Sequence, residues 1–421
     1  MLNRIALTLV FALSFAAYLA PELTVSRRFA PLILFGILVF LKVLCSNSAS
    51  SALGSLFDTD ALLFVFFLSF LTIGSSMASE FNESIQYWLL TTVILILARL
   101  YTAVVPVAEI LEAFFWSGVL SVGIFTTLVI SDFMLSVINL TRFSAFAFEP
   151  NVLAFVLSGY FCVMVWKFLR GGWRMRVLTG TAGTICLAMI LFASSRGSIA
   201  AILSGCAVVA GIAIFRAKKE QRRRVLFLGL AISASLLALF LFSDSRGWTA
   251  DAFDYTDQIL SLTSSDRGIE SGFTGRFDKW NETLGQMSDG SWLLGRGLRS
   301  SDSMDPPIDN SYLVILYELG FVPFALITFR FFAILSGFIR AQFHTQDQGR
   351  RELYSICSLL MAVFLVNDVV GRFMFALANP FSLFAFLLFA APTSVLELNA
   401  NVSKSEASST KYEWSREHSH A

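Results

Sequence analysis

The segment TGRFDKWNETLGQMSDGSWLLGRGL (residues 274–298) lies in the only long polar run between apolar stretches, residues 244–308. Elsewhere the chain is dominated by aliphatic and aromatic residues: of its 421 residues, 56% are hydrophobic, 14% are charged and 43 are phenylalanine. Soluble domains carry about 25% charged residues. The composition therefore predicts a polytopic membrane protein in which the run 244–308 is one large loop outside the bilayer.

The apolar stretches around this loop are long enough to cross a bilayer. A hydrocarbon core of about 30 Å needs ~20 apolar residues in a helix, and roughly twelve stretches approach that length. They lie near residues 4–20, 29–45, 61–77, 84–104, 107–131, 152–168, 177–193, 198–215, 225–243, 309–334, 353–370 and 373–392. We predict an all-α fold with a single transmembrane domain, residues 1–392, in which the first stretch is an uncleaved anchor. Residues 393–421, rich in Ser, Lys and Glu, form a tail typical of disorder.

Arginine and lysine mark three alternate connections between the predicted spans as cytoplasmic. These connections contain Lys167, Arg170, Arg174 and Arg176; Arg216, Lys218, Lys219, Arg222, Arg223 and Arg224; and Arg330, Arg340, Arg350 and Arg351. The 244–308 loop is then extracytoplasmic, and the tail is cytoplasmic. Arg27 and Arg28 fall on the extracytoplasmic side and go against the rule for the first spans.

Histidine and cysteine exclude several kinds of site. His344, His418 and His420 all fall on the predicted cytoplasmic side, so no extracytoplasmic histidine can act as a base or a zinc ligand. The five cysteines lie in apolar stretches, where we expect packing residues and neither disulfides nor a metal site. A net charge of +1 gives no reason to expect a nucleic-acid partner.

Arg196 stands between two apolar stretches, in ASSRGSIAAILSG (residues 193–205). A charge beside hydrocarbon either snorkels to the interface or faces a cavity in the protein, and the second case is typical of a functional site. Gly197, Ala201 and Gly205 follow at intervals of four residues. Such a stripe of small residues lets a helix pack closely on a neighbour and would hold Arg196 on a rigid element.

Apolar residues recur in the polar loop with a helical period. They are Phe277, Trp280, Leu284 and Met287, at spacings of three, four and three. The period predicts an amphipathic helix on the membrane surface. Arg276 on this helix is either a solvated charge or a cation at the level of lipid headgroups. Farther along, Gly295 and Gly297 permit a tight turn and a close approach of the backbone to a ligand.

The segment DNSYLVILYELG (residues 309–320) begins the next apolar stretch. Asp309 is placed to cap the helix, a role worth roughly 1 kcal/mol. A carboxylate there also stays ionised, so Asp309 could accept a proton from a sugar hydroxyl. Asn310 and Tyr312 offer hydrogen-bonding groups to a sugar, and Glu318 needs either an ion-pair partner or a wet cavity.

The segment RFSAFAFEPNVLAF (residues 142–155) brings further charges to the same face of the membrane. Pro150 fits the first position of a helix. That placement explains the proline but neither Arg142 nor Glu149. Glu149 is therefore the second candidate for the base.

Taken together, these residues make the chain similar to the bacterial superfamily of O-antigen ligases and O-antigen polymerases, which includes exopolysaccharide polymerases. The resemblance runs from about Arg142 to Gly320. It rests on four short motifs, which are here Arg142, Phe148, Pro150 and Asn151; Ser195, Arg196 and Gly197; Arg276, Trp280, Gly295 and Gly297; and Asp309, Asn310, Tyr312, Glu318 and Gly320. Ligases of this family usually carry a histidine where this chain has Asp309, which favours a polymerase.

The resemblance implies a metal-independent, inverting glycosyltransferase of the bacterial inner membrane that needs no cofactor and faces the periplasm. Its donor would be an undecaprenyl-diphosphate-linked oligosaccharide. Arg196, Arg276 and Arg142 would bind the diphosphate, Asp309 or Glu149 would act as the base, and Asn310, Tyr312 and Trp280 would bind sugar. A polymerase would join two lipid-linked repeat units in O-antigen or exopolysaccharide biosynthesis, with room for a chain-length regulator as partner. A ligase would transfer the glycan to the lipid A core in lipopolysaccharide biosynthesis.

A different class of function, a membrane transporter of polysaccharide precursors, also fits a chain with many spans. Secondary transporters bind their substrates near the bilayer midplane, between broken helices. Here the candidate polar groups gather at one face of the membrane, which favours the transferase.

Overall fold

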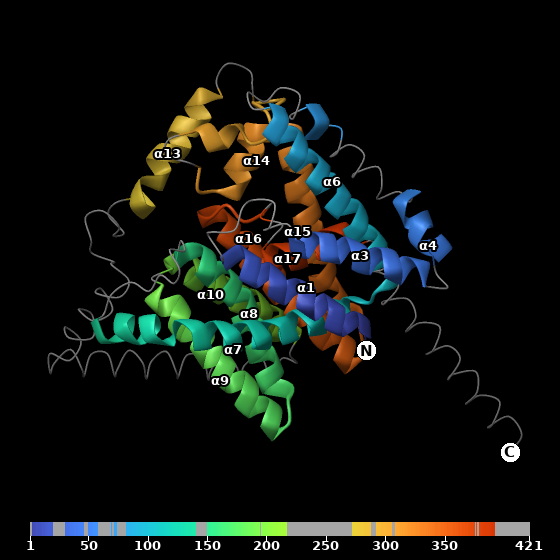
Figure 1. Cartoon of the computed structure of the whole chain (residues 1–421), viewed down its shortest axis with the longest axis vertical. Helices are drawn as coiled ribbons and strands as arrows, with labels where there is room; N and C mark the ends of the chain where they lie inside the picture. The colour runs from blue at the N-terminus through green and yellow to red at the C-terminus, as the bar shows by residue number, and fades with distance from the viewer. Residues whose placement is uncertain are drawn as a thin grey trace, which may run out of the picture.

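The computed structural model describes residues 2–19, 30–45, 49–57, 69, 71–73, 81–139, 150–193, 195–216, 272–287, 292–304, 308–374, 376 and 379–391. All regular structure in these ranges is helical (Figure 1). The helices before the predicted loop are α1 (Leu2–Leu19), α3 (Ala30–Leu44), α4 (Ala49–Gly54), η1 (Ser55–Phe57), α6 (Phe81–Val104), α7 (Val107–Asn139), α8 (Pro150–Arg170), α9 (Trp173–Phe192) and α10 (Arg196–Arg216). They are followed by α13 (Gly272–Gln286), η3 (Ser300–Ser303), α14 (Ser311–Leu319), α15 (Phe321–His344), α16 (Gln348–Val370) and α17 (Pro380–Ala390).

Within the described ranges, seven helices are long and apolar enough to cross a membrane. They are α6, α7, α8, α9, α10, α15 and α16; α1, α3 and α17 are shorter apolar helices. The chain is therefore a multi-pass membrane protein, as its composition predicts. The predicted spans near 225–243 and, for most of its length, 61–77 lie outside the described residues.

The apolar stretch 309–334, predicted as one span, is two helices. α14 ends at Leu319 and α15 begins at Phe321, because Gly320 adopts a φ of 86° that breaks the helical path. Only α15 is long enough to span the bilayer. Hydropathy gives no sign of this break, since apolar residues continue on both sides of it: leucine and tyrosine before Gly320, and phenylalanine and leucine after it.

α16 and α17 lie in the middle of the bundle (Figure 1). In the most apolar 18-residue stretch of α16, 67% is buried inside the protein, whereas the corresponding share in α10 is 28%. Every residue of α17 is buried. Phenylalanine rings fill this centre: Phe155 stacks on Phe373 with ring centroids 4.0 Å apart, and Phe114 stacks on Phe384 at 4.7 Å.

Two buried arginines satisfy the carbonyl groups at the carboxyl end of α17. Arg99 of α6 donates to Ala390 O at 3.2 Å, and Arg330 of α15 donates to Ala391 O at 2.6 Å. The last carbonyls of a helix have no partner within the helix and carry partial negative charge. The guanidinium groups therefore allow a short, wholly buried helix to end inside the protein.

The small-residue stripe of α10 packs against α16, as predicted. A Cβ at Gly205 would lie 2.7 Å from Val363 Cγ2 and 2.8 Å from Leu359 Cδ1, and a Cβ at Gly197 would overlap Val370. Ala201, between the two glycines, is fully buried. Close backbone approach is a common way for helices to associate in lipid.

Candidate active site at the Arg196 end of the bundle

The amino end of α10, which begins at Arg196, is joined to α16 by buried hydroxyl and amide groups. Ser198 donates to Asn367 Oδ1 at 3.1 Å, and Ser195 donates to Ser198 at 3.1 Å. Asn367 in turn donates to Ser158 of α8 at 3.3 Å. These contacts fix the position of the half-buried Arg196 relative to α16 and α8.

The amino end of α14 is joined to the same end of α16. Ser311 N donates to Gly371 O at 3.0 Å, and Ser311 Oγ donates to Asp368 Oδ1 at 2.5 Å. The backbone N–H groups of Phe373 and Met374 donate back to Ser311 Oγ. Asp368 is fully buried, and its second oxygen, Oδ2, has no hydrogen-bond partner among the described residues.

The first turns of α10 and α14 thus meet at the last turn of α16. Asn367 holds α10 and the adjacent Asp368 holds α14. Arg196 and Asp309, which are far apart in sequence, flank this junction at the starts of the two helices. We call this side of the molecule the Arg196 end.

Asp309 does not cap α14, and this prediction was wrong by one residue. Asn310 is the N-cap: its Oδ1 accepts hydrogen bonds from Tyr312 N at 2.9 Å and Leu313 N at 3.1 Å. Asp309 precedes the cap and is partly buried. The capping interpretation of Asp309 is therefore removed, and its role as the base stays a prediction.

Asn310 and Tyr312 both make contacts within the protein that their assignment to sugar binding did not foresee. The side-chain oxygen of Asn310 is engaged by the helix it caps. The Tyr312 hydroxyl donates to Leu365 O of α16 at 3.0 Å. Both residues help to position α14, and a role in binding sugar stays a prediction.

Glu318 has the ion-pair partner that its position required. Its side chain is 4% exposed, and Oε1 accepts from Arg372 at 3.2 Å and from the Ser301 hydroxyl. Arg372 also pairs with Asp302 at 2.5 Å, and Asp302 pairs with Arg299. Burial raises the pKa of Glu318, and the Arg372 guanidinium and the Ser301 hydroxyl offset part of that rise.

These ion pairs attach the segment 292–304 to the bundle. The Arg299 guanidinium lies 4.1 Å from the ring centroid of Tyr87 in α6, and Ser84 Oγ donates to Leu298 O at 2.5 Å. At its other end, Trp292 O accepts a hydrogen bond from Phe321 N, the first residue of α15. The segment therefore runs from α15 to α6 across the Arg196 end and is held at both places.

Gly295 allows one stretch of backbone to approach another closely, and the approach to a ligand stays a prediction. Its φ is 75°, and a Cβ there would overlap Glu318 O; a Cβ on Gly320 would overlap Leu293 O. The adjacent N–H groups of Arg296 and Gly297 donate to Tyr317 O at 2.8 Å and Glu318 O at 3.0 Å. The glycines seat segment 292–304 on the end of α14.

Arg276 and Trp280 lie on α13, the helix that the period of the loop predicts. One part of the α13 surface is buried against the protein: Thr283 is 1% exposed and Met287, just beyond the helix, is 4% exposed. Another part is not covered, since Leu284 is 47% exposed. Met287 packs with Ile308, Val314 and Tyr317. Part of the predicted membrane-facing surface is therefore protein core, and α13 sits on α14 at the Arg196 end (Figure 1).

Arg142 and Glu149 lie outside the described residues, so their positions stay predictions. Pro150 is the first residue of α8, as expected for a proline at a helix start. Among the residues that the structure describes, no group of three or more His, Cys, Asp or Glu side chains is arranged to hold a metal ion.

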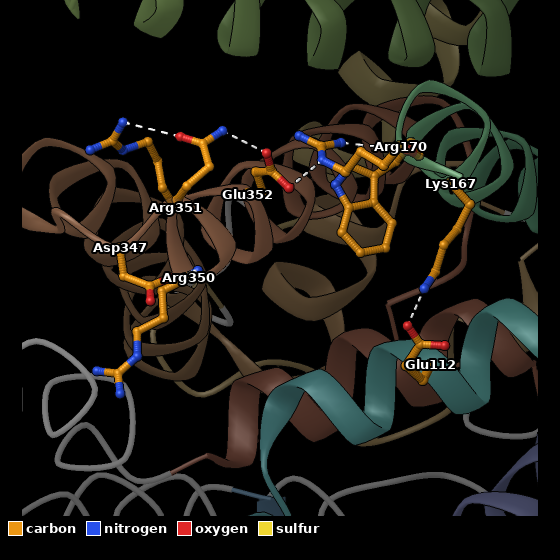
Figure 2. Close-up of polar contacts among 9 residues, drawn as sticks. Glu112, Lys167, Arg170, Asp347, Arg350, Arg351 and Glu352 are labelled. Carbon is orange, nitrogen blue, oxygen red and sulfur yellow. Dashed lines mark hydrogen bonds and ion pairs between the residues drawn. The ribbon is translucent and has the colours of Figure 1, made fainter. Parts of the chain in front are cut away.

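The opposite side of the bundle, which we call the Arg170 end, carries partly exposed ion pairs (Figure 2). Lys167 pairs with Glu112 of α7, and Arg170 pairs with Glu352 of α16 at 2.6 Å. Gln348 Nε2 donates a hydrogen bond to Glu352 Oε1 at 2.6 Å. Arg170 and Glu352 come from two connections that the basic-residue pattern assigned to one side of the membrane, and the structure places them together.

Arg372, Asp368 and Asn367 were missed by sequence reasoning as site residues. Arg372 is a single basic residue in a short connection, and a single Asn-Asp pair near the end of an apolar span has many structural uses. The sequence did contain one signal for these residues. Ionisable and amide side chains inside a membrane span cost free energy, so they usually have a structural or functional role.

Comparison with known proteins supports the resemblance given above. Residues 181–328 match the sequence model of a family described as O-antigen ligase. No curated protein is similar enough in sequence to match this chain. The matched segment contains Arg196, Arg276, Asp309 and Glu318, and it runs into α15. Residues 181–328 therefore match a domain family of O-antigen ligases and polymerases, whose members act on lipid-linked glycans in polysaccharide biosynthesis.

Proposed function

We propose that the protein is a polymerase that joins undecaprenyl-diphosphate-linked oligosaccharide repeat units into O-antigen or exopolysaccharide at the periplasmic face of the inner membrane. The main support is the meeting of the α10 and α14 amino ends at one turn of α16; both of these helix ends lie inside the segment that matches the family. This arrangement brings the neighbourhoods of a candidate cation, Arg196, and a candidate base, Asp309, to one end of the bundle.

The diphosphate leaving group sets the first chemical requirement. When the acceptor hydroxyl attacks the anomeric carbon, the bond to the diphosphate breaks, its electron pair stays on the phosphate oxygen, and the anomeric configuration inverts. Arg196 can offer a bidentate guanidinium to these oxygens. It is also the first residue of α10, and the N–H groups and dipole at a helix start favour an anion. In this proposal Arg276 and Arg142 add further positive charge.

The acceptor hydroxyl sets the second requirement, because its proton must be transferred as the new glycosidic bond forms. Asp309 is our first candidate for the base: Asn310 performs the helix capping that would otherwise engage it. Glu149 is the rival candidate. Glu318 is a poor candidate, since it is buried and paired with Arg372 and Ser301.

A ligase that transfers the glycan to the lipid A core is the second candidate function. The family match carries that description, but Asp309 stands where ligases usually have histidine. A precursor transporter is the third candidate. It is disfavoured because the candidate residues on α10 and α14 lie at helix starts at the end of the bundle, whereas secondary transporters bind near the midplane.

The lipid-linked glycans of a deletion strain separate the three functions. Loss of a polymerase leaves single repeat units on the lipid carrier at the periplasmic face. Loss of a ligase leaves full-length polymer on the carrier, and loss of a transporter leaves precursor on the cytoplasmic face. Complementation with Asp309→Asn and Glu149→Gln then identifies the base, because only the variant that lacks the true base fails to restore product.

A further inference from the structure

A turn of three consecutive apolar residues is exposed at the Arg196 end. Trp292, Leu293 and Leu294 are 51%, 43% and 40% exposed. A turn that faces water is normally polar, and a run of three exposed apolar side chains calls for a partner surface. We call residues 292–294 the apolar turn.

The apolar turn is held rigidly against the first residue of α15. Phe321 N donates to Trp292 O at 2.8 Å, and the rings of these two residues meet edge to face with centroids 6.2 Å apart. The backbone contact between Gly295 and Gly320 closes the other side of the turn. Its position relative to α15 is therefore fixed.

The length of α15 places the apolar turn at the level of the membrane interface. α15 has 24 residues, which at 1.5 Å per residue is about 36 Å and exceeds the ~30 Å of a hydrocarbon core. Its outward face is lipid-like, with Phe321, Phe329 and Phe332 48%, 67% and 51% exposed. The turn continues this apolar surface beyond the first residue of the helix, at the depth where tryptophan is enriched in membrane proteins.

The remainder of segment 292–304 has the opposite character. Arg299 and Asp302 pair with each other, Asp302 also pairs with Arg372, and Ser303 is exposed beside them. The segment thus has one apolar end next to α15 and one polar end next to α6. This division matches a surface that is partly in lipid and partly in water.

We propose that the apolar turn inserts into the interfacial region of the bilayer beside the amino end of α15. The partner is the membrane itself, with acyl chains and the adjoining ester groups around Trp292, Leu293 and Leu294. This contact anchors segment 292–304, and through Gly295 it steadies the end of α14 that carries Glu318. The inference stands whether the protein acts as a polymerase or a ligase.

Site-specific labelling in lipid nanodiscs tests the inference. The exposed Cys45 and Cys206 are replaced by alanine, leaving the buried cysteines in place. Leu293→Cys then carries an environment-sensitive fluorophore, and Ser303→Cys serves as the matched control in the same segment. We expect blue-shifted emission at position 293 and at least twofold stronger quenching by a nitroxide at lipid carbon 5 than at position 303. Aqueous iodide should quench position 303 more strongly.

Two outcomes would overturn the inference. Equal iodide quenching at both positions would place the turn in water. Shielding of position 293 from iodide and from the lipid nitroxide together would mean that a protein surface covers it. A second measurement avoids the label: wild-type protein should lose more tryptophan fluorescence in brominated lipid than Trp292→Phe does, and equal losses would contradict insertion.

Discussion

The two ends of the helix bundle use charge in opposite ways. At the Arg170 end, Arg170 and Glu352 form an ion pair whose side chains are 34% and 26% exposed. At the Arg196 end, Asp368 is fully buried and Glu318 is 4% exposed, and both are bonded to groups from other helices or segments. Exposed ion pairs contribute little to stability because water screens them. Buried polar groups are costly unless they keep their partners.

The difference indicates where the molecule tolerates change. The Arg170 end can lose a charge and keep its fold, because no backbone position depends on that pair alone. At the Arg196 end, adjacent residues of α16 hold the starts of α10 and α14. A single substitution there should change the fold and the candidate active site together.

Removing the Asp368 side chain should have the largest effect on stability. Asp368→Ala leaves Ser311 Oγ and Phe373 N without their carboxylate acceptor, which should cost about 3 kcal/mol. Asp368→Asn keeps an acceptor oxygen and should lose far less. Thermal unfolding of the purified protein in detergent measures both, and an alanine variant as stable as wild type would show that the junction does not depend on Asp368.

The second-largest loss of stability is expected when a methyl group is added at Gly205. Gly205→Ala would place a Cβ 2.8 Å from Leu359 Cδ1 and 3.1 Å from Leu359 O, so α10 and α16 must separate at a cost of about 2 kcal/mol. Gly211→Ala is the matched control on the same helix, since nothing lies within 4 Å of a Cβ there. It should be neutral or slightly stabilising. Equal melting temperatures for the two variants would argue against close packing of these helices.

The buried Glu318 should make stability depend on pH. Because burial raises its pKa above the ordinary value of 4.5, the folded protein holds this proton more tightly than the unfolded chain does. The free energy of unfolding should therefore fall as pH rises from about 4.5 through the raised pKa. Glu318→Gln removes this slope, whereas Asp302→Asn, which alters the more exposed member of the same cluster, should keep it. A slope that survives Glu318→Gln would assign the dependence to another group.

The smallest effect belongs to the Arg170 end. Glu352→Gln removes the charge that pairs with Arg170, and we expect a change in the free energy of unfolding below about 1 kcal/mol. The same thermal assay checks it. A loss as large as that of Asp368→Ala would erase the contrast between the two ends.

The parts of the fold set by local pattern could be predicted from the sequence. Hydropathy located α8, α9, α10 and α16, and the spacing of apolar residues located α13 within a polar loop. The small residues Gly197, Ala201 and Gly205 predicted that α10 packs closely on a neighbouring helix, and α16 is that neighbour. Such packing could be predicted because it depends mainly on side-chain size.

The parts set by contacts between distant segments could not be predicted. The break at Gly320 depends on Gly295, which lies on another segment, and nothing in the local hydropathy marks it. The link between Asp368 and Ser311 joins residues 57 apart in the chain. The choice of Asn310 over Asp309 as the cap is a difference of one residue, which local preference alone does not settle, since asparagine and aspartate cap equally well.

The most direct test compares the two arginines at the ends of α10. In membranes supplied with a lipid-diphosphate-linked donor, Arg196→Ala should lower the rate of diphosphate-lipid release by ~10² or more, the loss expected when a cation that stabilises a leaving group is removed. Arg216→Ala, at the other end of the same helix, should release product at nearly the wild-type rate. Equal rates for Arg196→Ala and Arg216→Ala, with both proteins folded in the membrane, would contradict the role proposed for Arg196.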